Sequence, residues 1–195
     1  GISTGLITTV NAVIGDKTRD TGFHVTTPDA VALQELLANM VDAGMTHCVV
    51  EVTSHGLVQQ RVSACSFDVV VLTNITHEHL DYHGTLESYM NAKFMLFDQN
   101  SHTVSKIETN KLAVLNQNDN QSYDYIKNKL KTDMVDYGIE VQATVSASNI
   151  IVNERTTYFD VNIGDDCFPV ETVLIGQYNI SNCLAAIAAT YNGLA

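Results

Sequence analysis

The sequence has few basic residues and few prolines. Ten lysines and arginines stand against 22 aspartates and glutamates, which gives a formal net charge of −12 with histidine neutral. Since duplex binding needs a net basic face, this balance argues against a nucleic-acid partner. Only two prolines occur in 195 residues, of which 45% are hydrophobic. This composition excludes a disordered tail and a collagen-like chain, and the length allows one domain with a core of its own.

Signals for export or membrane insertion are also missing. The sequence has no secretory leader pattern and no apolar run of about 18 residues, so neither a signal peptide nor a membrane span is expected. Its cysteines show no CxxC spacing and lie at Cys48, Cys65, Cys167 and Cys183. Isolated cysteines in apolar sequence are typical of reduced thiols inside the cell. We therefore expect a cytoplasmic protein without membrane contact.

Apolar runs that alternate with helical patterns predict an α/β fold. Strands are expected at residues 5–10, 47–52, 67–74 and 112–116, and helices at about 28–43, 86–98, 120–131 and 179–192. The runs at 47–52 and 67–74 are β-branched and nearly continuous, as in parallel strands covered on both faces. Turn signals between about 134 and 175 separate short alternating runs and predict antiparallel hairpins packed beside the main sheet. The predicted fold is a mainly parallel sheet flanked by helices, with a small antiparallel β subsheet.

Two of the predicted helices have a clear apolar stripe. The first is framed by Thr27 as N-cap, Pro28 at the first helical position and Gly44 just past the end. Its inward stripe is expected to comprise Leu33, Leu36, Leu37, Met40 and Val41. The stripe of the last helix is expected to comprise Ile180, Cys183, Leu184, Ile187 and Tyr191.

Polar side chains follow three of the predicted strands. They are Glu51, Thr53, Ser54 and His55 after the first, then Thr73, Asn74, Thr76, His77, Glu78, His79, Asp81 and His83, and finally Asn116, Asn118 and Asp119. Ligands of open α/β sheets bind beyond the carboxyl ends of the strands, so these groups are expected in one crevice suited to Mg²⁺ and phosphate chemistry. The alternative is that they are polar because loops run over the surface. Zinc is a weaker option, since HExxH spacing and nearby cysteines are missing.

Lys93 conflicts with the pattern of its own helix. The helix that Thr85 opens has the inward stripe Leu86, Tyr89, Met90 and Phe97. At about 100° per residue, Lys93 falls in the middle of that stripe. Either its ammonium reaches the surface along its apolar stem, or it is paired, deprotonated or chemically altered, because an unpaired buried ammonium is costly.

Four stretches resemble signatures of the Mur ligases, in the family's order along the chain. They are residues 26–30, 51–62, 67–93 and 176–182. The resemblance is closest to the members that add the third residue, lysine or diaminopimelate, to the peptidoglycan stem. It implies a P-loop-NTPase-like central domain of an enzyme that uses ATP and Mg²⁺ to join an amino acid to UDP-N-acetylmuramyl-peptide through an acyl phosphate.

The resemblance also assigns roles to individual residues. Glu51 and His79 match the family's Mg²⁺ ligands, and Lys93 matches a lysine that is carbamylated in these enzymes and holds a second Mg²⁺. The three are therefore expected to be the catalytic and metal-binding residues. Positions that contact the UDP-muramyl-peptide are matched by Thr26, Thr27, Thr53, Gln59 and Arg61. Asn179 and Asn182 match the nucleotide side, although an N-cap is an equal alternative for Asn179.

One family motif has no match. A phosphate-cradling G-x-x-x-x-G-K-[ST] loop needs a glycine followed by lysine, and no glycine here is followed by lysine. The run Gly15-Asp16-Lys17-Thr18 is only superficially similar. The family places this loop just before the segment that resembles residues 1–10, so residues 1–195 are expected to be a central domain without that loop and without the N- and C-terminal domains, inactive alone.

Two other interpretations remain open at this point. One is another Mur-like amide ligase, such as a relative of cyanophycin synthetase or folylpolyglutamate synthase. The other is a non-catalytic module that keeps the fold for assembly or UDP-sugar binding.

Overall fold

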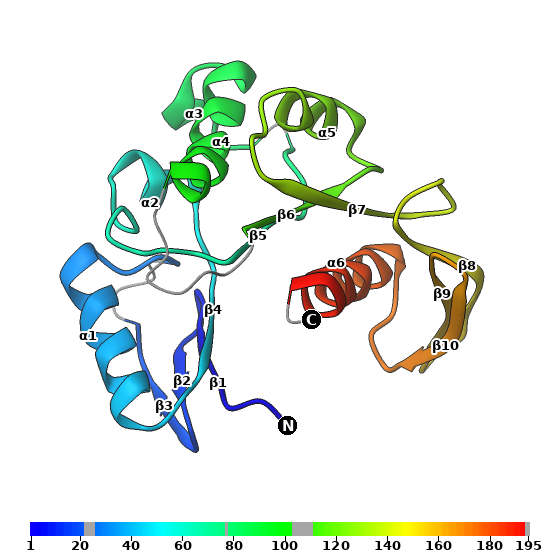
Figure 1. The fold of residues 1–195 in the computed structure, drawn as a ribbon, viewed down its shortest axis with the longest axis horizontal. Coiled ribbons are helices and arrows are strands. Elements are labelled where there is room, and N and C mark those ends of the chain that lie inside the picture. The colour runs from blue at the N-terminus through cyan, green and yellow to red at the C-terminus, as the bar shows by residue number, and fades with distance from the viewer. Residues whose placement is uncertain (22–25, 77, 103–110, 194–195) are drawn as a thin grey trace. The chain divides into compact units, whose positions relative to one another are not determined.

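The computed structural model describes residues 1–21, 26–76, 78–102 and 111–193, without the side chains of residues 100–102. The chain forms two compact units (Figure 1). Unit 1 comprises Gly1–Cys65 and Asn91–Met95, and unit 2 comprises Ser66–Met90 and Leu96–Ala195. Within the described ranges, no helix is both long enough and apolar enough to cross a membrane.

Unit 1 contains a four-stranded sheet of order β3-β2-β1-β4. Strands β1 (Thr4–Ile7) and β4 (His47–Val50) pair in parallel, and β2 (Ala12–Ile14) and β3 (Lys17–Arg19) add an antiparallel hairpin. Two residues, Gly15 and Asp16, connect the hairpin, and Gly15 has a φ of 62°, which glycine adopts without strain. The run Gly15-Asp16-Lys17-Thr18 is therefore a hairpin turn. Strands this short carry no periodic signal, which is why the sequence predicted no strand there.

Helix α1 (Ala30–Asp42) begins two residues later than predicted. Its N-cap is Asp29, whose Oδ1 accepts hydrogen bonds from the backbone N–H of Val31 at 3.0 Å and of Ala32 at 2.9 Å. The prediction of Thr27 as N-cap is wrong, because the Thr27 hydroxyl is engaged with the end of β4.

The other end of α1 agrees with the prediction. Gly44 has a φ of 75°, and its N–H and that of Met45 donate to the carbonyls of Val41 and Met40. This pair of bonds is a Schellman motif, which ends helices at glycine. Of the predicted stripe, Leu33, Leu36 and Met40 are buried and Leu37 is half-buried, but Val41 is 72% exposed. A short helix, α2 (Ser54–Val58), follows β4.

Unit 2 contains a six-stranded sheet of order β10-β9-β8-β7-β6-β5. Strands β5 (Val69–Leu72), β6 (Leu112–Asn116) and β7 (Asp133–Ile139) are parallel, and β7 also pairs in parallel with β8 (Val145–Val152). Strands β9 (Thr157–Ile163) and β10 (Asp166–Thr172) continue the sheet with antiparallel pairing. The predicted α/β class is confirmed. The antiparallel hairpins, however, extend the main sheet by hydrogen bonds, and β7 belongs to its parallel part.

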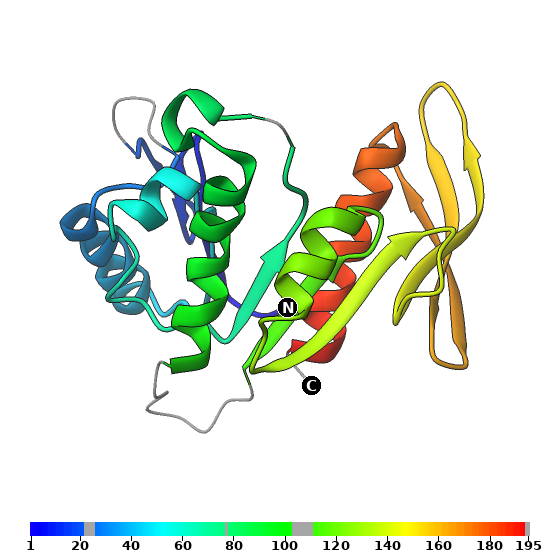
Figure 2. The same cartoon turned by 90° about the horizontal axis from the view of Figure 1, so that it is seen from above.

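The helices of unit 2 are α3 (Leu80–His83), α5 (Asn120–Lys127) and α6 (Gln177–Gly193), while α4 (Leu86–His102) contributes to both units. Helix α6 packs along strands β5 to β8 (Figure 2). Ile180 and Leu184 of α6 are fully buried in the core of this unit. Tyr191, which the periodicity placed inward, is 50% exposed, and its hydroxyl donates to Asp166 at 3.3 Å.

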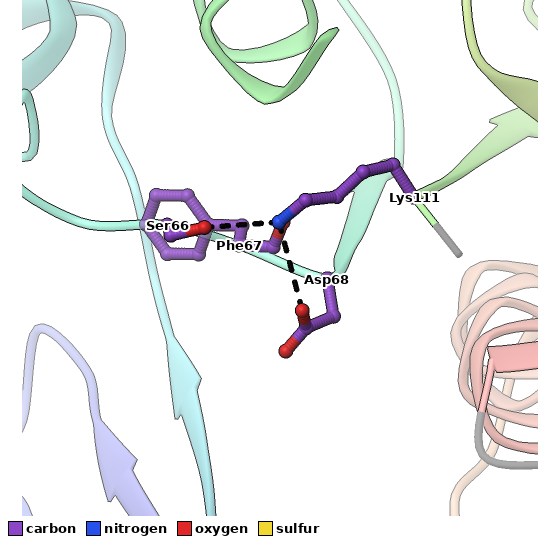
Figure 3. A network of polar contacts seen from close by, with 4 residues as sticks. All are labelled: Ser66, Phe67, Asp68 and Lys111. Atoms are coloured by element: carbon purple, nitrogen blue, oxygen red, sulfur yellow. Dashed lines mark hydrogen bonds and ion pairs between the residues drawn. The ribbon is translucent and has the colours of Figure 1, made fainter. Parts of the chain in front are cut away.

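Lys111 fixes the amino ends of β5 and β6 (Figure 3). Its Nζ donates hydrogen bonds to Ser66 Oγ at 3.0 Å and to the Phe67 carbonyl, and lies 3.6 Å from the Asp68 carboxylate. The side chain of Lys111 is only 12% exposed, whereas that of Asp68 is 56% exposed. Because ligands bind at the carboxyl ends of such strands, this network supports the fold and not a site.

Candidate functional site

Thr27 organises the loop between β4 and α2 in unit 1. Its side chain is fully buried. The Thr27 Oγ1 donates to the Glu51 carbonyl at 3.1 Å, accepts the backbone N–H of Thr53 at 2.9 Å and lies 3.2 Å from Thr53 Oγ1. A Cβ at Gly56 would lie 3.0 Å from Thr27 Cβ, so glycine at this position lets the start of α2 come close. One hydroxyl therefore holds the backbone of the loop that carries Glu51.

Glu51 lies at the carboxyl edge of the β1–β4 pair. Its N–H donates to the Ile7 carbonyl at 2.8 Å, which continues the pairing of the two strands. Its carboxylate Oε2 is 3.0 Å from the N–H of Thr9 and 3.1 Å from the Thr9 hydroxyl, and that hydroxyl lies 2.9 Å from Thr26 Oγ1. The residue as a whole is exposed. Glu51 thus presents a carboxylate that is oriented by its neighbours and open to a ligand.

Thr9 is a member of this site that the sequence reasoning missed. It follows β1, and β1 is the parallel neighbour of β4. The rule that polar residues collect where parallel strands end applies to it as well as to Glu51. The signal was therefore present, but residues 8–10 had been assigned to the strand itself.

Lys93 belongs to the same unit as Glu51. It is half-buried, and Tyr89, Met90 and Phe97 of its predicted stripe are buried. Burial lowers the pKa of the Lys93 ammonium, and the charge of the Glu51 carboxylate opposes this shift. The inward position predicted from periodicity is confirmed.

Arg61 is held in a fixed orientation beside this loop. Its Nε and Nη2 donate to Gln59 Oε1 at 2.9 and 2.6 Å, and its Nη1 donates to the Thr27 carbonyl at 2.6 Å. The residues matched to substrate contacts therefore lie around one loop of unit 1. Among them, Thr26 and Gln59 are accessible, whereas the Thr27 side chain is buried in the folded chain.

In unit 2, His79 lies beside a row of aromatic rings. The His79 ring meets Tyr89 edge-on at a centroid distance of 5.8 Å and an interplanar angle of 81°. His83 stacks on Tyr89 at 5.1 Å and 22°, and Tyr82 meets His83 edge-on at 4.9 Å. Burial, and then the charge of Glu78, raise the pKa of the Tyr89 phenol. His77 of this predicted cluster lies outside the described residues.

Polar residues at the end of β6 and just after it bind neighbouring backbone. Asn116 Nδ2 donates to the Thr73 carbonyl at 2.7 Å, and Asp119 Oδ2 accepts the N–H of Ile75 at 2.7 Å. The Asn118 side chain accepts from the N–H of Ile139 at 2.7 Å and donates to its carbonyl at 3.1 Å. These three side chains therefore tie the ends of β5, β6 and β7 together, which supports the interpretation of them as structural loop residues.

Asn179 and Asn182 lie near the start of α6. Asn179 Nδ2 donates to the Ile175 carbonyl at 2.9 Å. Since α6 begins at Gln177, Asn179 is inside the helix, and the alternative that it is the N-cap is wrong. Asn182 is exposed, as expected from its place off the apolar stripe.

The three predicted catalytic residues are divided between the units. Glu51 and Lys93 belong to unit 1 and His79 to unit 2, so their meeting in one site stays a prediction. The described residues contain no group of three or more histidines, cysteines, aspartates and glutamates arranged to hold a metal. Mg²⁺ is usually held by one or two carboxylates together with phosphates and waters. The exposed, oriented carboxylate of Glu51 fits that mode of binding.

Comparisons with known proteins agree with this architecture. The model of the Mur ligase middle domain matches residues 2–190. The UDP-N-acetylmuramoyl-L-alanyl-D-glutamate--2,6-diaminopimelate ligase of Bacillus cereus is 42% identical over 193 residues, which cover 97% of this chain and 38% of the relative. The chain thus spans well under half the length of the curated relatives it matches.

Solved structures give the same result. A structure of a UDP-N-acetylmuramoyl-L-alanyl-D-glutamate--2,6-diaminopimelate ligase has a TM-score of 0.83 at 28% identity, covering 97% of this chain and 37% of that one. The MurF ligase of Thermotoga maritima in complex with ADP shares the fold, with a TM-score of 0.62 at 17% identity over 79% of this chain and 35% of its own. The chain belongs to the Mur ligase middle domain family.

Proposed function

We propose that this chain is the middle domain of a longer ATP-dependent ligase that adds diaminopimelate or lysine to UDP-N-acetylmuramoyl-L-alanyl-D-glutamate. The name of the Bacillus cereus relative supports diaminopimelate as the amino acid. The observation that carries the proposal is the exposed Glu51 carboxylate, held by Thr9 at the carboxyl edge of β1 and β4, with the half-buried Lys93 in the same unit. Together they form the kind of polar strand-end site that phosphoryl transfer requires.

The proposed reaction has two steps. The substrate carboxylate takes the γ-phosphoryl group of ATP and ADP leaves. The amine of the incoming amino acid then attacks the acyl phosphate, and phosphate leaves from the tetrahedral intermediate as the amide forms. Bound Mg²⁺ supplies charge neutralisation at the phosphate oxygens. In this proposal Glu51 and His79 hold one Mg²⁺, and carbamylated Lys93 holds a second.

Carbamylation explains why a lysine occupies an inward position. The neutral amine attacks CO₂, an N–C bond forms, and a proton is released. Because burial lowers the pKa of Lys93, more of the reactive neutral amine is present at a given pH. The product carries a negative charge, which suits a metal ligand better than an ammonium does.

The remaining predicted residues act in binding. Arg61 uses three of its five N–H groups on Gln59 and Thr27, which orients the guanidinium toward an anionic substrate and leaves two donors for it. Thr26, Thr53 and Gln59 complete the substrate side, and the buried Thr27 supports the loop. Asn182, with Asn179 beside it, serves the nucleotide. We assign the reaction to the cytoplasm, where the four cysteines, none of which forms a disulfide in the structure, stay reduced.

The test uses the full-length protein and measures phosphate release with ATP, UDP-N-acetylmuramoyl-L-alanyl-D-glutamate and each amino acid. We expect release with diaminopimelate or lysine only when all substrates are present. Glu51→Gln is expected to need far more Mg²⁺, while Glu35→Gln, at an exposed position of α1, is expected to behave as the wild type. No release with either amino acid contradicts the proposed substrates, and an unchanged Mg²⁺ requirement in Glu51→Gln contradicts the assignment of Glu51.

A further inference from the structure

Tyr89 is the common neighbour of two histidines in unit 2. One face of its ring stacks with His83, and His79 meets it edge-on. Both centroid distances, 5.1 and 5.8 Å, fall within the range in which aromatic pairs attract each other. Tyr82 extends the row by meeting His83 edge-on. Tyr89 is only 5% exposed, so its ring is fixed by packing.

The backbone of His79 has an unusual conformation. Its φ is 58°, in the left-handed region that few residues other than glycine adopt. Such a conformation persists where the surrounding structure enforces it, and it clusters at functional sites. Here the His79 carbonyl accepts the N–H of Tyr82 at 3.1 Å and of His83 at 3.0 Å, which fixes the backbone at the start of α3. The His79 side chain makes no cap hydrogen bond to this helix.

The geometry points to Tyr89 as a positioning residue that orients the imidazole of His79 for metal binding. This inference rests on the proposed function, in which His79 is a Mg²⁺ ligand. The left-handed His79 precedes α3 without capping it through its side chain, and the edge-on contact with Tyr89 of α4 sets the plane of the imidazole. His83 and Tyr82 in turn prevent the Tyr89 ring from turning. Removing a group that orients a metal ligand lowers the metal affinity about 10- to 100-fold.

The contacts with His79 and His83 described above are made by the ring of Tyr89. Tyr89→Phe keeps the ring and is expected to keep the metal affinity. Tyr89→Leu removes the ring and is expected to weaken the affinity about tenfold. Phe97→Leu is the matched control, because Phe97 is equally buried on the same helix, at 2% exposed, and has no ring contact with His79 among those the structure shows.

The experiment measures Mn²⁺ affinity of the full-length protein with a non-hydrolysable ATP analogue by electron paramagnetic resonance, with thermal melting of each variant as the check of folding. We expect weaker binding in His79→Ala and Tyr89→Leu and wild-type binding in Tyr89→Phe and Phe97→Leu. His83→Leu removes the stacked ring and supplies the test if Tyr89→Leu does not fold; it is expected to weaken binding in the same direction.

Three results overturn the inference, and they are distinguishable. If His79→Ala weakens Mn²⁺ binding but Tyr89→Leu and His83→Leu do not, then His79 is a ligand that needs no orientation by Tyr89. If His79→Ala also binds Mn²⁺ as the wild type does, then the ligand role in the proposed function fails, and the positioning role fails with it. Equal weakening in Phe97→Leu and Tyr89→Leu also overturns it, because any loss of core packing then has the same effect.

Discussion

Replacing Thr27 by valine tests how the loop that carries Glu51 is held. Valine keeps the shape of the side chain and removes the hydroxyl. Its two hydrogen bonds to the loop backbone are then lost, one to the Glu51 carbonyl at 3.1 Å and one from the Thr53 N–H at 2.9 Å, together with the 3.2 Å contact with Thr53 Oγ1. Each such bond contributes about 1 kcal/mol net. We therefore expect Thr27→Val to lower the free energy of unfolding by about 2 kcal/mol, and Thr27→Ser, which keeps the hydroxyl, to lower it less.

The assay is urea unfolding of this chain, followed by the fluorescence of its eight tyrosines, since it contains no tryptophan. Linear extrapolation gives the free energy of unfolding for each variant. Thr46→Val is the control, because Thr46 lies exposed beside the start of β4. If Thr27→Val is as stable as the wild type, or if Thr46→Val loses as much, the reasoning that a single buried hydroxyl holds this loop is refuted.

Four further predictions concern other parts of the chain. In the full-length enzyme, Lys93→Ala is expected to lose turnover that bicarbonate does not restore and short carboxylic acids partly restore; wild-type turnover removes the carbamate role. Lys111→Met should lower the urea midpoint while Asp68→Asn leaves it nearly unchanged, because Asp68 is 56% exposed; equal losses contradict this. Asn182→Ala should raise the KM for ATP without changing the melting temperature, and an unchanged KM counts against a nucleotide contact. Burial raises the pKa of Cys48 to about 11, so at pH 8 about one Cys48 thiol in a thousand is ionised. Mass spectrometry after alkylation at pH 8 should therefore find the exposed Cys167 labelled before Cys48. Equal labelling of Cys48 and Cys167 contradicts the raised pKa of Cys48.

The sequence predicted best those elements whose residues are covered on both faces. Strand β6 was predicted with its observed bounds, Leu112–Asn116, because all five residues are buried and the apolar run is continuous. The hairpin of β2 and β3 was missed because strands of three residues show no period. Strand β7 was placed among the hairpins because its alternating pattern is the same for parallel and antiparallel neighbours, and the partner β6 is distant in sequence.

Helix periodicity gives the direction of a side chain but not the extent of the surface it meets. Val41 and Tyr191 have the correct period for burial, yet both lie in the last turns of their helices and are exposed. The N-cap of α1 illustrates a second limit. Thr27 and Asp29 are both good caps, and only the tertiary hydrogen bonds of Thr27 show that Asp29 caps the helix.

The candidate site was predictable where one local rule sufficed. The rule for strand ends predicted the position of Glu51 at the carboxyl edge of β4, and helical period predicted the inward position of Lys93; their roles in a site stay a prediction. Thr9 was missed because the apolar pattern predicted a strand through residue 10, whereas β1 ends at Ile7, so the rule for strand ends was not applied to Thr9. The aromatic row at His79 could not be predicted, since it depends on a left-handed backbone at a histidine, for which the sequence carries no signal.

The proposal for Lys93 is that it carries a carbamate, which holds one of the metal ions. The most direct measurement is ¹³C nuclear magnetic resonance of the full-length protein in ¹³C-bicarbonate, with and without Mn²⁺ and a non-hydrolysable ATP analogue. We expect a carbamate signal that is absent in Lys93→Ala and strongly broadened when Mn²⁺ binds. A wild-type spectrum without that signal, or a signal that Mn²⁺ leaves sharp, contradicts it.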